Sequence, residues 1–347
     1  MVLKIRAKSE SAAKACQLLE ELQLLFVATL EEQTKASDFE RVEWLRDAGQ
    51  SGGGWRYEAR SHGAFNRASI NFSQVHYDHK PEKSLASATA LSAIVHPFNP
   101  FSPSLHLHIS WTEFKNGDGY WRLMADLNPG IEDNELTKTF RQNLQEVSGP
   151  LFNQAEKAGD QYFFIPAIGR HRGACHFYLE GYHSGSFEKD LVLSENMGKR
   201  VISEYCKIVQ ETSLKNPCPS SEDFRAQLEY HTLYFFQVLT LDRGTTAGLL
   251  VHDQNDLGVL GSLPASIDTS LLKLWCKNMP SPQNSLLEAI IDSLGEGTPL
   301  AVDHLVKEKI ASIIREHYRK FPKALDLLAT GGKIPQTGSQ HYAQPRT

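Results

Sequence analysis

The chain has 347 residues, of which 41% are hydrophobic and 22% are charged, and this is the composition of an ordinary globular protein. A formal net charge of −5 provides no overall basic surface, which argues against nucleic acid as the main partner. The five cysteines are widely spaced and form no Cys-x-x-Cys pair, which argues against a disulfide framework and against a zinc site.

The N-terminal segment lacks the apolar core of a secretory signal. The longest apolar run covers residues 24–30 and is interrupted by Thr29, so it is far too short to span a bilayer. We therefore expect a cytoplasmic protein with no membrane span.

The first part of the chain is expected to begin with helices. Leucines recur at helical spacing and predict an amphipathic helix over residues 9–35, and a short helix is expected over residues 38–48. The three glycines at 52–54 then interrupt the pattern. They lack the Lys-Ser/Thr of a P-loop and the spacing of a dinucleotide fingerprint, so we interpret them as a flexible turn rather than a phosphate loop.

A series of strand-like segments follows, and several of them are separated by turn residues. The clearest turn is Asn116-Gly117-Asp118-Gly119, which is typical of a tight hairpin. The predicted strands fall within residues 55–57, 68–75, 90–95, 105–114, 120–126, 162–165, 173–179 and 234–241.

Helices are predicted between and after these strands, at residues 132–158, 188–213, 222–230, 283–294 and 302–320. Strands that follow one another as hairpins, with helices grouped between them, favour an α+β fold with a large, mainly antiparallel sheet. No Pro/Gly-rich linker divides the chain, so we expect a single domain. The tail at 331–347 is rich in Gly, Pro, Gln and Ser and is expected to be disordered.

Residues 94–109 are the most informative segment for function. Three prolines stiffen the backbone between His96 and His106, because each fixes its own φ and restricts the preceding residue. Strict alternation over residues 105–109 predicts a strand that presents His106 and His108 on one face. Rigidly held imidazoles are suited to proton transfer near neutral pH.

The same histidines allow a second interpretation. His96, His106 and His108 together with Asp126 could form a metal site of the two-histidine, one-carboxylate kind. They could equally act as acid, base and hydrogen-bond donors without a metal. The spacing does not decide between the two.

Two further charged motifs are candidate site residues. Asp242-Arg243-Gly244-Thr245 follows the apolar segment 234–241, where charged residues often line a cleft, although a surface turn is equally compatible. The run Arg170-His171-Arg172 is a candidate anion site, because a guanidinium pairs with a carboxylate through two hydrogen bonds. A solvated turn is the alternative.

Taken in order, these motifs resemble the oxygen-dependent coproporphyrinogen III oxidase family. The segment His96-Pro97-Phe98-Asn99-Pro100, followed by His106, is similar to the core motif of that family. The other similar blocks cover residues 52–54, 70–73, 75–76, 125–129, 160–163, 172–173, 241–245 and 262–264.

The resemblance implies a flat antiparallel sheet with helices on both sides, a homodimer, and a cleft for a tetrapyrrole. The implied reaction converts propionates of coproporphyrinogen III to vinyl groups, giving protoporphyrinogen IX in heme biosynthesis. Dioxygen is the co-substrate, and no organic cofactor or metal is expected. The family-like domain would cover residues 1–295, followed by a C-terminal helical extension at 296–330.

The resemblance also assigns roles to individual residues. His106 would be the proton donor, Asp242 or Asp126 would face the pyrrole nitrogens, and arginines would hold propionates. The remaining residues would form the substrate side, with one histidine supporting the proline loop. The two arginines are Arg243 and Arg172, and the substrate-side residues are Ser92, His96, His108 and Ser110.

Two departures from the family pattern affect the expected substrate. Ser110 stands where an arginine is expected, and a Gly-Gly-Arg segment is replaced by His252-Asp253-Gln254-Asn255. Loss of two substrate-side arginines would weaken carboxylate binding. Two alternatives therefore accompany the leading hypothesis: a relative that binds a tetrapyrrole or acts on another carboxylated pyrrolic substrate, and a metal-dependent oxygenase that uses the histidines and Asp126.

Overall fold

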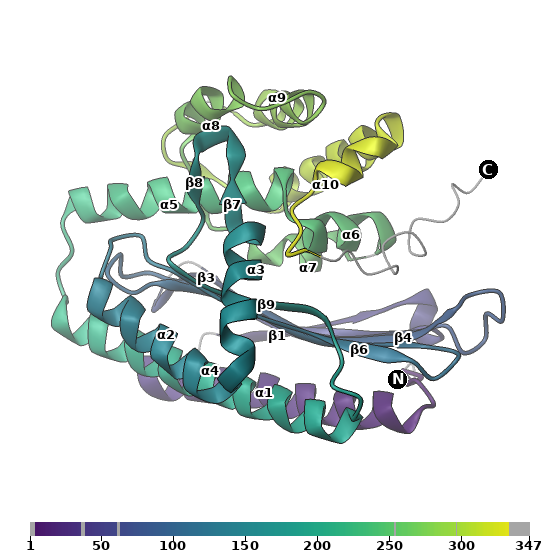
Figure 1. The fold of residues 1–347 in the computed structure, drawn as a ribbon. Coiled ribbons are helices and arrows are strands. Elements are labelled where there is room, and N and C mark those ends of the chain that lie inside the picture. Colours follow the sequence, from purple (N-terminus) through teal and green to yellow (C-terminus); the bar gives the residue numbers. More distant parts are fainter. Residues whose placement is uncertain (1–3, 36–38, 61–62, 253–254, 296, 333–347) are drawn as a thin grey trace.

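The strand-like segments of the first half of the chain form one antiparallel sheet in the computed structural model, which describes residues 4–35, 39–60, 63–252, 255–295 and 297–332. The sheet has seven strands, each antiparallel to its neighbours (Figure 1). In spatial order they are β1 (Glu40–Leu45), β2 (Gly52–Arg60), β3 (Phe65–His76), β4 (Leu85–Pro97), β5 (Ser104–Phe114), β6 (Gly119–Asn128) and β9 (Cys175–Tyr182).

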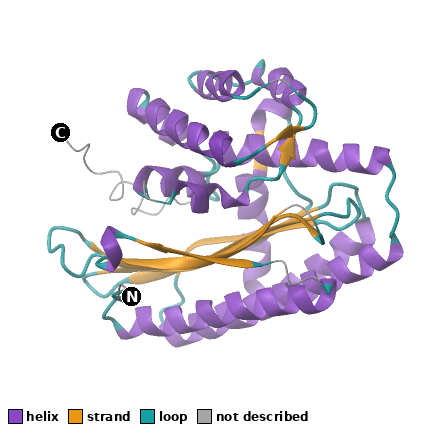
Figure 2. Ribbon diagram, turned by 180° about the vertical axis from the view of Figure 1, so that it is seen from behind, coloured by secondary structure: helices purple, strands orange, loops and turns teal. Residues whose placement is uncertain are grey.

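Helices cover both faces of this sheet, as Figure 2 shows from behind, and the predicted α+β architecture is confirmed. One face carries α1 (Glu10–Thr34), α2 (Asn134–Ser148) and α4 (Phe187–Lys215), while α3 (Phe152–Phe163) packs on β9 at the sheet edge. The opposite layer contains α5 (Ser221–Thr240), α6 (Arg243–Val251), α7 (Asp256–Val259), α8 (Thr269–Cys276), α9 (Gln283–Ser293) and α10 (His304–Lys320). Two small two-stranded sheets complete the described part: β7 (Phe164–Ile165) with β8 (Arg170–His171), and β10 (Ser266–Ile267) with β11 (Leu300–Ala301).

Alternation along the strands divides the molecule into a core face and a polar face. On β5, Leu105, Leu107 and Ile109 are buried in the core shared with α1 and α4. The residues between them, His106 and His108, therefore point to the opposite side of the sheet, as the sequence predicts. A second hydrophobic core joins α5 to α8, α9 and α10 beyond that side.

The segment that was expected to be a short helix at 38–48 is mainly a strand. Residues 40–45 form β1, which pairs with β2, and only Asp47–Gly49 makes a single 3-10 turn. Trp44 is buried and Glu43 is exposed, so the segment has the two-residue period of a strand. The helix prediction was wrong because a short segment with few apolar residues does not define a period well.

The three glycines at 52–54 are not a flexible turn, so that prediction was also wrong. They begin β2 and pair on one side with β1 and on the other with β3. A Cβ atom at Gly54 would lie 2.0 Å from the carbonyl oxygen of Phe72, and Gly52 has a φ of +92°. Glycine is therefore required by close strand approach and by backbone conformation rather than by flexibility.

The largest error concerns residues 222–241, where a helix followed by a strand was predicted. The structure has one continuous helix, α5, which begins with a capping box between Ser220 and Asp223. Residues 230–240 are buried on every side of this helix. A fully buried helix has no polar face, so its sequence is a continuous apolar run that resembles a buried strand. Similarly, most of the strand predicted at 162–165 is the end of α3 and the two-residue strand β7.

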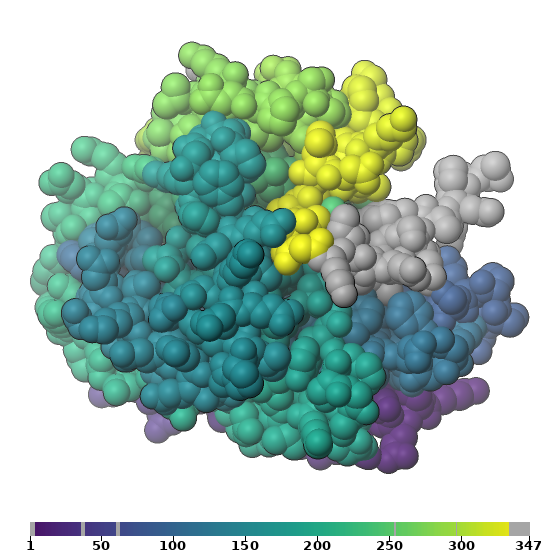
Figure 3. Space-filling view, in the orientation of Figure 1, coloured from purple at the N-terminus to yellow at the C-terminus, as the bar shows by residue number. Residues whose placement is uncertain are grey.

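The helices after residue 296 pack into the main body of the protein. Ile310, Ile314 and Tyr318 of α10 and Leu328 beyond it lie in the core that α5 forms with α8 and α9. In the space-filling view the yellow C-terminal residues lie directly against the helical layer and beside the teal part of the chain (Figure 3). The predicted disordered tail at 331–347 lies outside the described residues from 333 onward. Across the described ranges, no helix is both long and apolar enough to cross a membrane.

Candidate active site

A cavity of about 320 Å³ lies between the polar face of the sheet and the α5–α6 layer. Its floor consists of alternate residues of β3, β4, β5 and β6, and its roof includes α6 and the turn Leu260–Ser262. The volume falls at the lower end of the range typical of small-molecule sites, about 300–1,000 Å³. A pocket of this kind, with convergent polar groups on a rigid sheet, is the candidate functional site.

Six of the nine predicted site residues line this cavity, and three do not. Strand register brings the sheet residues together, because Ser92 is directly opposite His108 and Ile94 is opposite His106. The six in the lining are Ser92, His106, His108, Ser110, Asp242 and Arg243. His96, Asp126 and Arg172 are not in the lining. His96 contacts Ser262 of the lining and Arg172 contacts His106, whereas Asp126 is bound to Arg172.

Arg172 fixes the protonation state of His106. The guanidinium donates a hydrogen bond to Nδ1 of His106 across 3.2 Å, and a guanidinium nitrogen has no lone pair to accept one. Nδ1 must therefore carry the lone pair, and the proton of the neutral ring is on Nε2. Burial and the nearby Arg172 charge hold the pKa of His106 well below its usual value, so the ring is a neutral N–H donor.

Arg172 itself does not reach the cavity surface. Its side chain is 0% exposed, and it donates to Asp126 and, across 2.8 Å, to Oε1 of Gln237. The guanidinium also packs against the rings of Phe163 and Tyr234. This arrangement fits a positioning residue for His106 rather than a direct ligand of a propionate.

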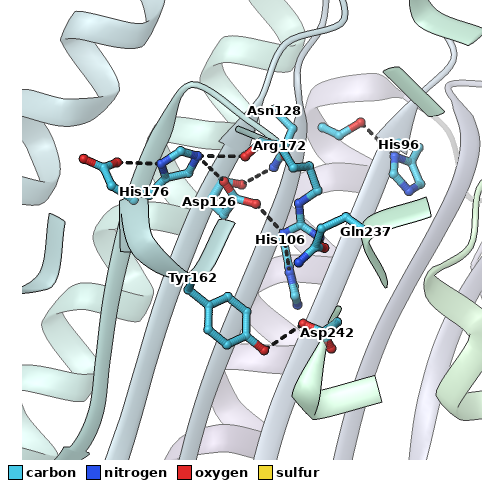
Figure 4. A network of polar contacts seen from close by, with 11 residues as sticks. His96, His106, Asp126, Asn128, Tyr162, Arg172, His176, Gln237 and Asp242 are labelled. Carbon is cyan, nitrogen blue, oxygen red and sulfur yellow. Dashed lines mark hydrogen bonds and ion pairs between the residues drawn. The ribbon is translucent and has the colours of Figure 1, made fainter. Parts of the chain in front are cut away.

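A second buried ion lies behind Arg172 (Figure 4). His176 donates from Nε2 to the carbonyl oxygen of Arg172 and from Nδ1 to Asp160, both across 2.8 Å. Both partners accept, so both ring nitrogens carry protons. Although burial acts to lower it, the pKa of His176 is raised because Asp160 and Asp126 stabilise the cation. Asp126 thus lies between two cations, with Oδ1 3.5 Å from His176 and Oδ2 bonded to Arg172.

Asp242 is held in one orientation at the start of α6. Its Oδ2 accepts from the backbone N–H of Thr245 across 2.6 Å as the N-cap of the helix, and its Oδ1 accepts from the Tyr162 hydroxyl across 2.9 Å (Figure 4). The N-terminus of a helix stabilises a carboxylate. Asp242 therefore presents a fixed anionic group to the cavity that contains the His106 N–H.

The second arginine predicted to hold a propionate, Arg243, is bound by the C-terminal segment. Its guanidinium donates to the carbonyl oxygens of Leu325, Leu328 and Ala329 at 3.3–3.4 Å. Arg243 also borders the cavity. A propionate would have to share the guanidinium with these carbonyls.

His96 ties the proline loop to the cavity wall. Its Nδ1 bonds to the Ser104 hydroxyl across 2.8 Å, and its Nε2 bonds to the carbonyl oxygen of Ser262 across 3.1 Å. These contacts fit the expected supporting role. With both ring nitrogens of His96 bonded and Asp126 paired with Arg172, the predicted four-residue metal set does not converge, and the described ranges contain no group of three or more His, Cys, Asp or Glu that could hold a metal.

The run 170–172 does not form the anion site considered from the sequence. Arg170 is half exposed and pairs with Glu229 on the surface, whereas Arg172 is buried. The replacement segment at 252–255 can be followed only in part, because residues 253 and 254 lie outside the described residues.

The cavity also contains polar residues that the sequence analysis missed. Tyr162 binds Asp242, and the partly buried Arg122 pairs with Glu180, which in turn accepts from Tyr178. Alternation along residues 120–126 could have placed Arg122 on the face of His106. The pairing of β6 with β9 joins segments that are distant in the chain, and no local signal predicts it.

A sheet with helices on both faces, and a pocket on its polar face lined by carboxylate, imidazole and hydroxyl groups, define an α+β protein with an enzyme-like site. The family model of coproporphyrinogen III oxidase matches residues 14–291, and the chain belongs to that family. The family comprises oxidoreductases that decarboxylate coproporphyrinogen, which supports a role in porphyrin biosynthesis. The match ends within α9, before α10 and the segment that binds Arg243.

Proposed function

We propose that this protein catalyses the oxygen-dependent oxidative decarboxylation of coproporphyrinogen III, converting propionates to vinyl groups and giving protoporphyrinogen IX. The observation that carries the proposal is that a fixed carboxylate, Asp242, and a neutral N–H donor, His106, line the same cavity. Family membership supplies the substrate class.

The proposed step balances with dioxygen as oxidant. For each propionate, the bond to the carboxylate carbon breaks and releases carbon dioxide, and one hydrogen leaves the carbon next to the ring as a proton. The two electrons released pass to dioxygen, which takes up two protons to give hydrogen peroxide. No organic cofactor or metal enters this balance, because the two electrons come from the C–H and C–C bonds of the propionate side chain and the macrocycle stays at the porphyrinogen level.

The cavity residues have distinct proposed roles. Asp242 accepts hydrogen bonds from pyrrole N–H groups and favours their deprotonation, which makes the ring more reactive toward dioxygen. His106 donates its Nε2–H to reduced oxygen or to a substrate carboxylate. Arg172 keeps that proton on Nε2, and Ser92 and His108 complete the wall that contacts the ring.

Aerobic incubation of the purified protein with freshly reduced coproporphyrinogen III tests the proposal. Products are oxidised to porphyrins and separated by chromatography. The dicarboxylic divinyl product is expected for the wild type and is expected to be lost in His106→Ala and Asp242→Ala. His304→Ala, which removes an exposed histidine at the start of α10, is the matched control and should retain activity.

A second candidate function is tetrapyrrole binding without turnover. It is favoured by the engagement of the Arg243 guanidinium with three C-terminal carbonyls and by Ser110 in place of an arginine. Under this alternative, the wild type binds coproporphyrin and returns the tetracarboxylic substrate unchanged. The same chromatography distinguishes the two.

We also propose, from the family resemblance, that the active form is a homodimer in the cytoplasm and that activity requires no bound metal. Sedimentation at micromolar concentration should give twice the chain mass. Activity should be indifferent to chelators, and elemental analysis should find far less than one metal per chain. Chelator-sensitive activity would instead favour the metal-dependent oxygenase.

A further inference from the structure

Among the described residues, the cavity lining contains two arginines. They differ in whether their N–H donors already have hydrogen-bond partners. Arg243 is bound by three backbone carbonyls. Arg122 uses Nη2 to pair with Glu180, but its Nε is buried and has no hydrogen-bond partner. A buried N–H without a partner is costly, and a ligand carboxylate would satisfy it.

The residues around Arg122 orient its guanidinium but leave part of its hydrogen-bonding capacity available to a ligand. Glu180 on β9 accepts from Arg122 through one oxygen and from the Tyr178 hydroxyl, 2.6 Å away, through the other. Both oxygens of Glu180 are therefore occupied, and the pair leaves no unbalanced negative charge at this end of the cavity. Arg122 is about one-fifth exposed, so it retains access to the cavity interior.

Arg122 also lies next to Ser110, the position at which the family resemblance predicts an arginine. It lies on β6 directly opposite Ser110 on β5, and both side chains face the cavity. Directly opposed residues in an antiparallel pair have Cβ atoms about 4.5–5.5 Å apart. The guanidinium of Arg122 can therefore reach a ligand group bound next to Ser110.

We propose that Arg122 is the carboxylate-binding and specificity-determining residue of this cavity. The inference rests on the proposed function, because it assumes a carboxylated tetrapyrrole as ligand. Arg122 binds one carboxylate of that ligand beside Ser110, with Glu180 and Tyr178 as positioning residues. The side-chain acid of the ligand, rather than its ring alone, then determines how tightly it binds.

Fluorescence titration of the full chain with coproporphyrin III and with its tetramethyl ester tests this assignment. The test variant is Arg122→Gln/Glu180→Gln, which removes both charges together and leaves no unpaired buried ion. Its affinity for the acid is expected to fall about 10- to 100-fold while its affinity for the ester stays unchanged. Adding Ser110→Arg to this variant should restore preference for the acid.

The matched control is Arg141→Gln/Glu156→Gln, which removes a charge pair on α2 and α3, away from the cavity. It should bind both ligands as the wild type does. If the double variant at Arg122 and Glu180 keeps the wild-type affinity for the acid, the assignment of Arg122 is overturned and the proposed function stands.

Two other outcomes separate this inference from the proposed function. If the wild type fails to bind coproporphyrin III and fails to convert coproporphyrinogen III, both proposals are overturned. If Arg122 controls acid binding but no product forms, the assignment of Arg122 is supported and the proposed turnover is not.

Discussion

Arg172 lies between His106 and Asp126, and its position determines which nitrogen of His106 carries the proton. The sequence predicted both Arg172 and His106 as site residues but assigned Arg172 to a propionate. That role depended on which way the side chain points, and nothing within residues 170–172 specifies it. The buried position follows from the strand pairing of β6 with β9 and from packing between Phe163 and Tyr234.

Tyr162 is the residue whose contribution can be isolated most cleanly. Tyr162→Phe removes the hydroxyl that donates to Oδ1 of Asp242 and leaves the ring in place. A buried carboxylate that loses one hydrogen bond is destabilised by about 1–3 kcal/mol, so we expect kcat to fall about tenfold or more with little change in KM.

The steady-state rate on coproporphyrinogen III measures this effect. Tyr57→Phe on β2 is the control, because that ring packs against the core on the other face of the sheet. Equal rates for Tyr162→Phe and the wild type would show that the orientation of Asp242 does not depend on the hydroxyl.

Helix α5 is the element that the local sequence pattern predicted least well. Its first half has exposed polar positions and was predicted as a helix, whereas residues 230–240 are buried all round and were predicted as a strand. A strand and a buried helix require the same apolar composition, and only the second core against α8, α9 and α10 distinguishes them. By contrast, α1, α4, α9 and α10 each begin and end within a few residues of prediction, because exposed polar faces define their period.

The C-terminal segment after α10 is expected to contribute to stability through one buried leucine. Leu328 is 3% exposed and lies in the second core, whereas its neighbour Leu327 is 45% exposed. Leu328→Ala should destabilise the protein by about 2–5 kcal/mol through the lost burial and the cavity left behind. Leu327→Ala should change stability by less than about 0.5 kcal/mol.

Urea unfolding of the two variants measures these changes. A small effect of both substitutions would mean that the segment that binds Arg243 is not docked in solution. A large effect of Leu328→Ala alone would support the docked position of the carbonyls that engage Arg243.

At the scale of the whole molecule, most of the sheet could be predicted from the sequence. The helical layer over the cavity could be predicted only in part. The hairpin at 116–119 and the alternation of residues 105–114 give β5 and β6 and the face that carries His106 and His108. Neither the hairpin nor the alternation indicates that β9 pairs with β6 or that α6 lines the other side of the cavity. Those features depend on contacts between residues far apart in the chain, such as Tyr162 with Asp242.

Four histidines with a lowered pKa predict that the stability of the whole molecule depends on pH. Burial lowers the pKa of His96, His106, His108 and His231, the last two to about 3, whereas the unfolded value is about 6.5. Below pH 6.5 the unfolded chain therefore binds more protons than the folded chain. The contribution of these neutral histidines to the free energy of unfolding is therefore fully present above pH 6.5 and is lost as the pH falls below it. His176, whose pKa is raised, has the opposite effect and offsets part of the loss.

The free energy of unfolding should accordingly drop between pH 7 and pH 5.5 by about 1 kcal/mol for each of the four histidines. Denaturant titrations at the two pH values measure the drop. His108→Gln should reduce it by about 1 kcal/mol, and the exposed-site variant His304→Gln should leave it unchanged. Equal stability at both pH values would contradict the neutral state of these rings.

Dioxygen is the proposed oxidant of coproporphyrinogen III in this cavity. The most direct measurement is release of carbon dioxide from coproporphyrinogen III in matched reactions under air and under argon, with the porphyrin product identified in each. We expect carbon dioxide and the divinyl product under air and neither under argon. Equal product in both gases would show that dioxygen is not the acceptor, and no product in either would contradict the assigned activity.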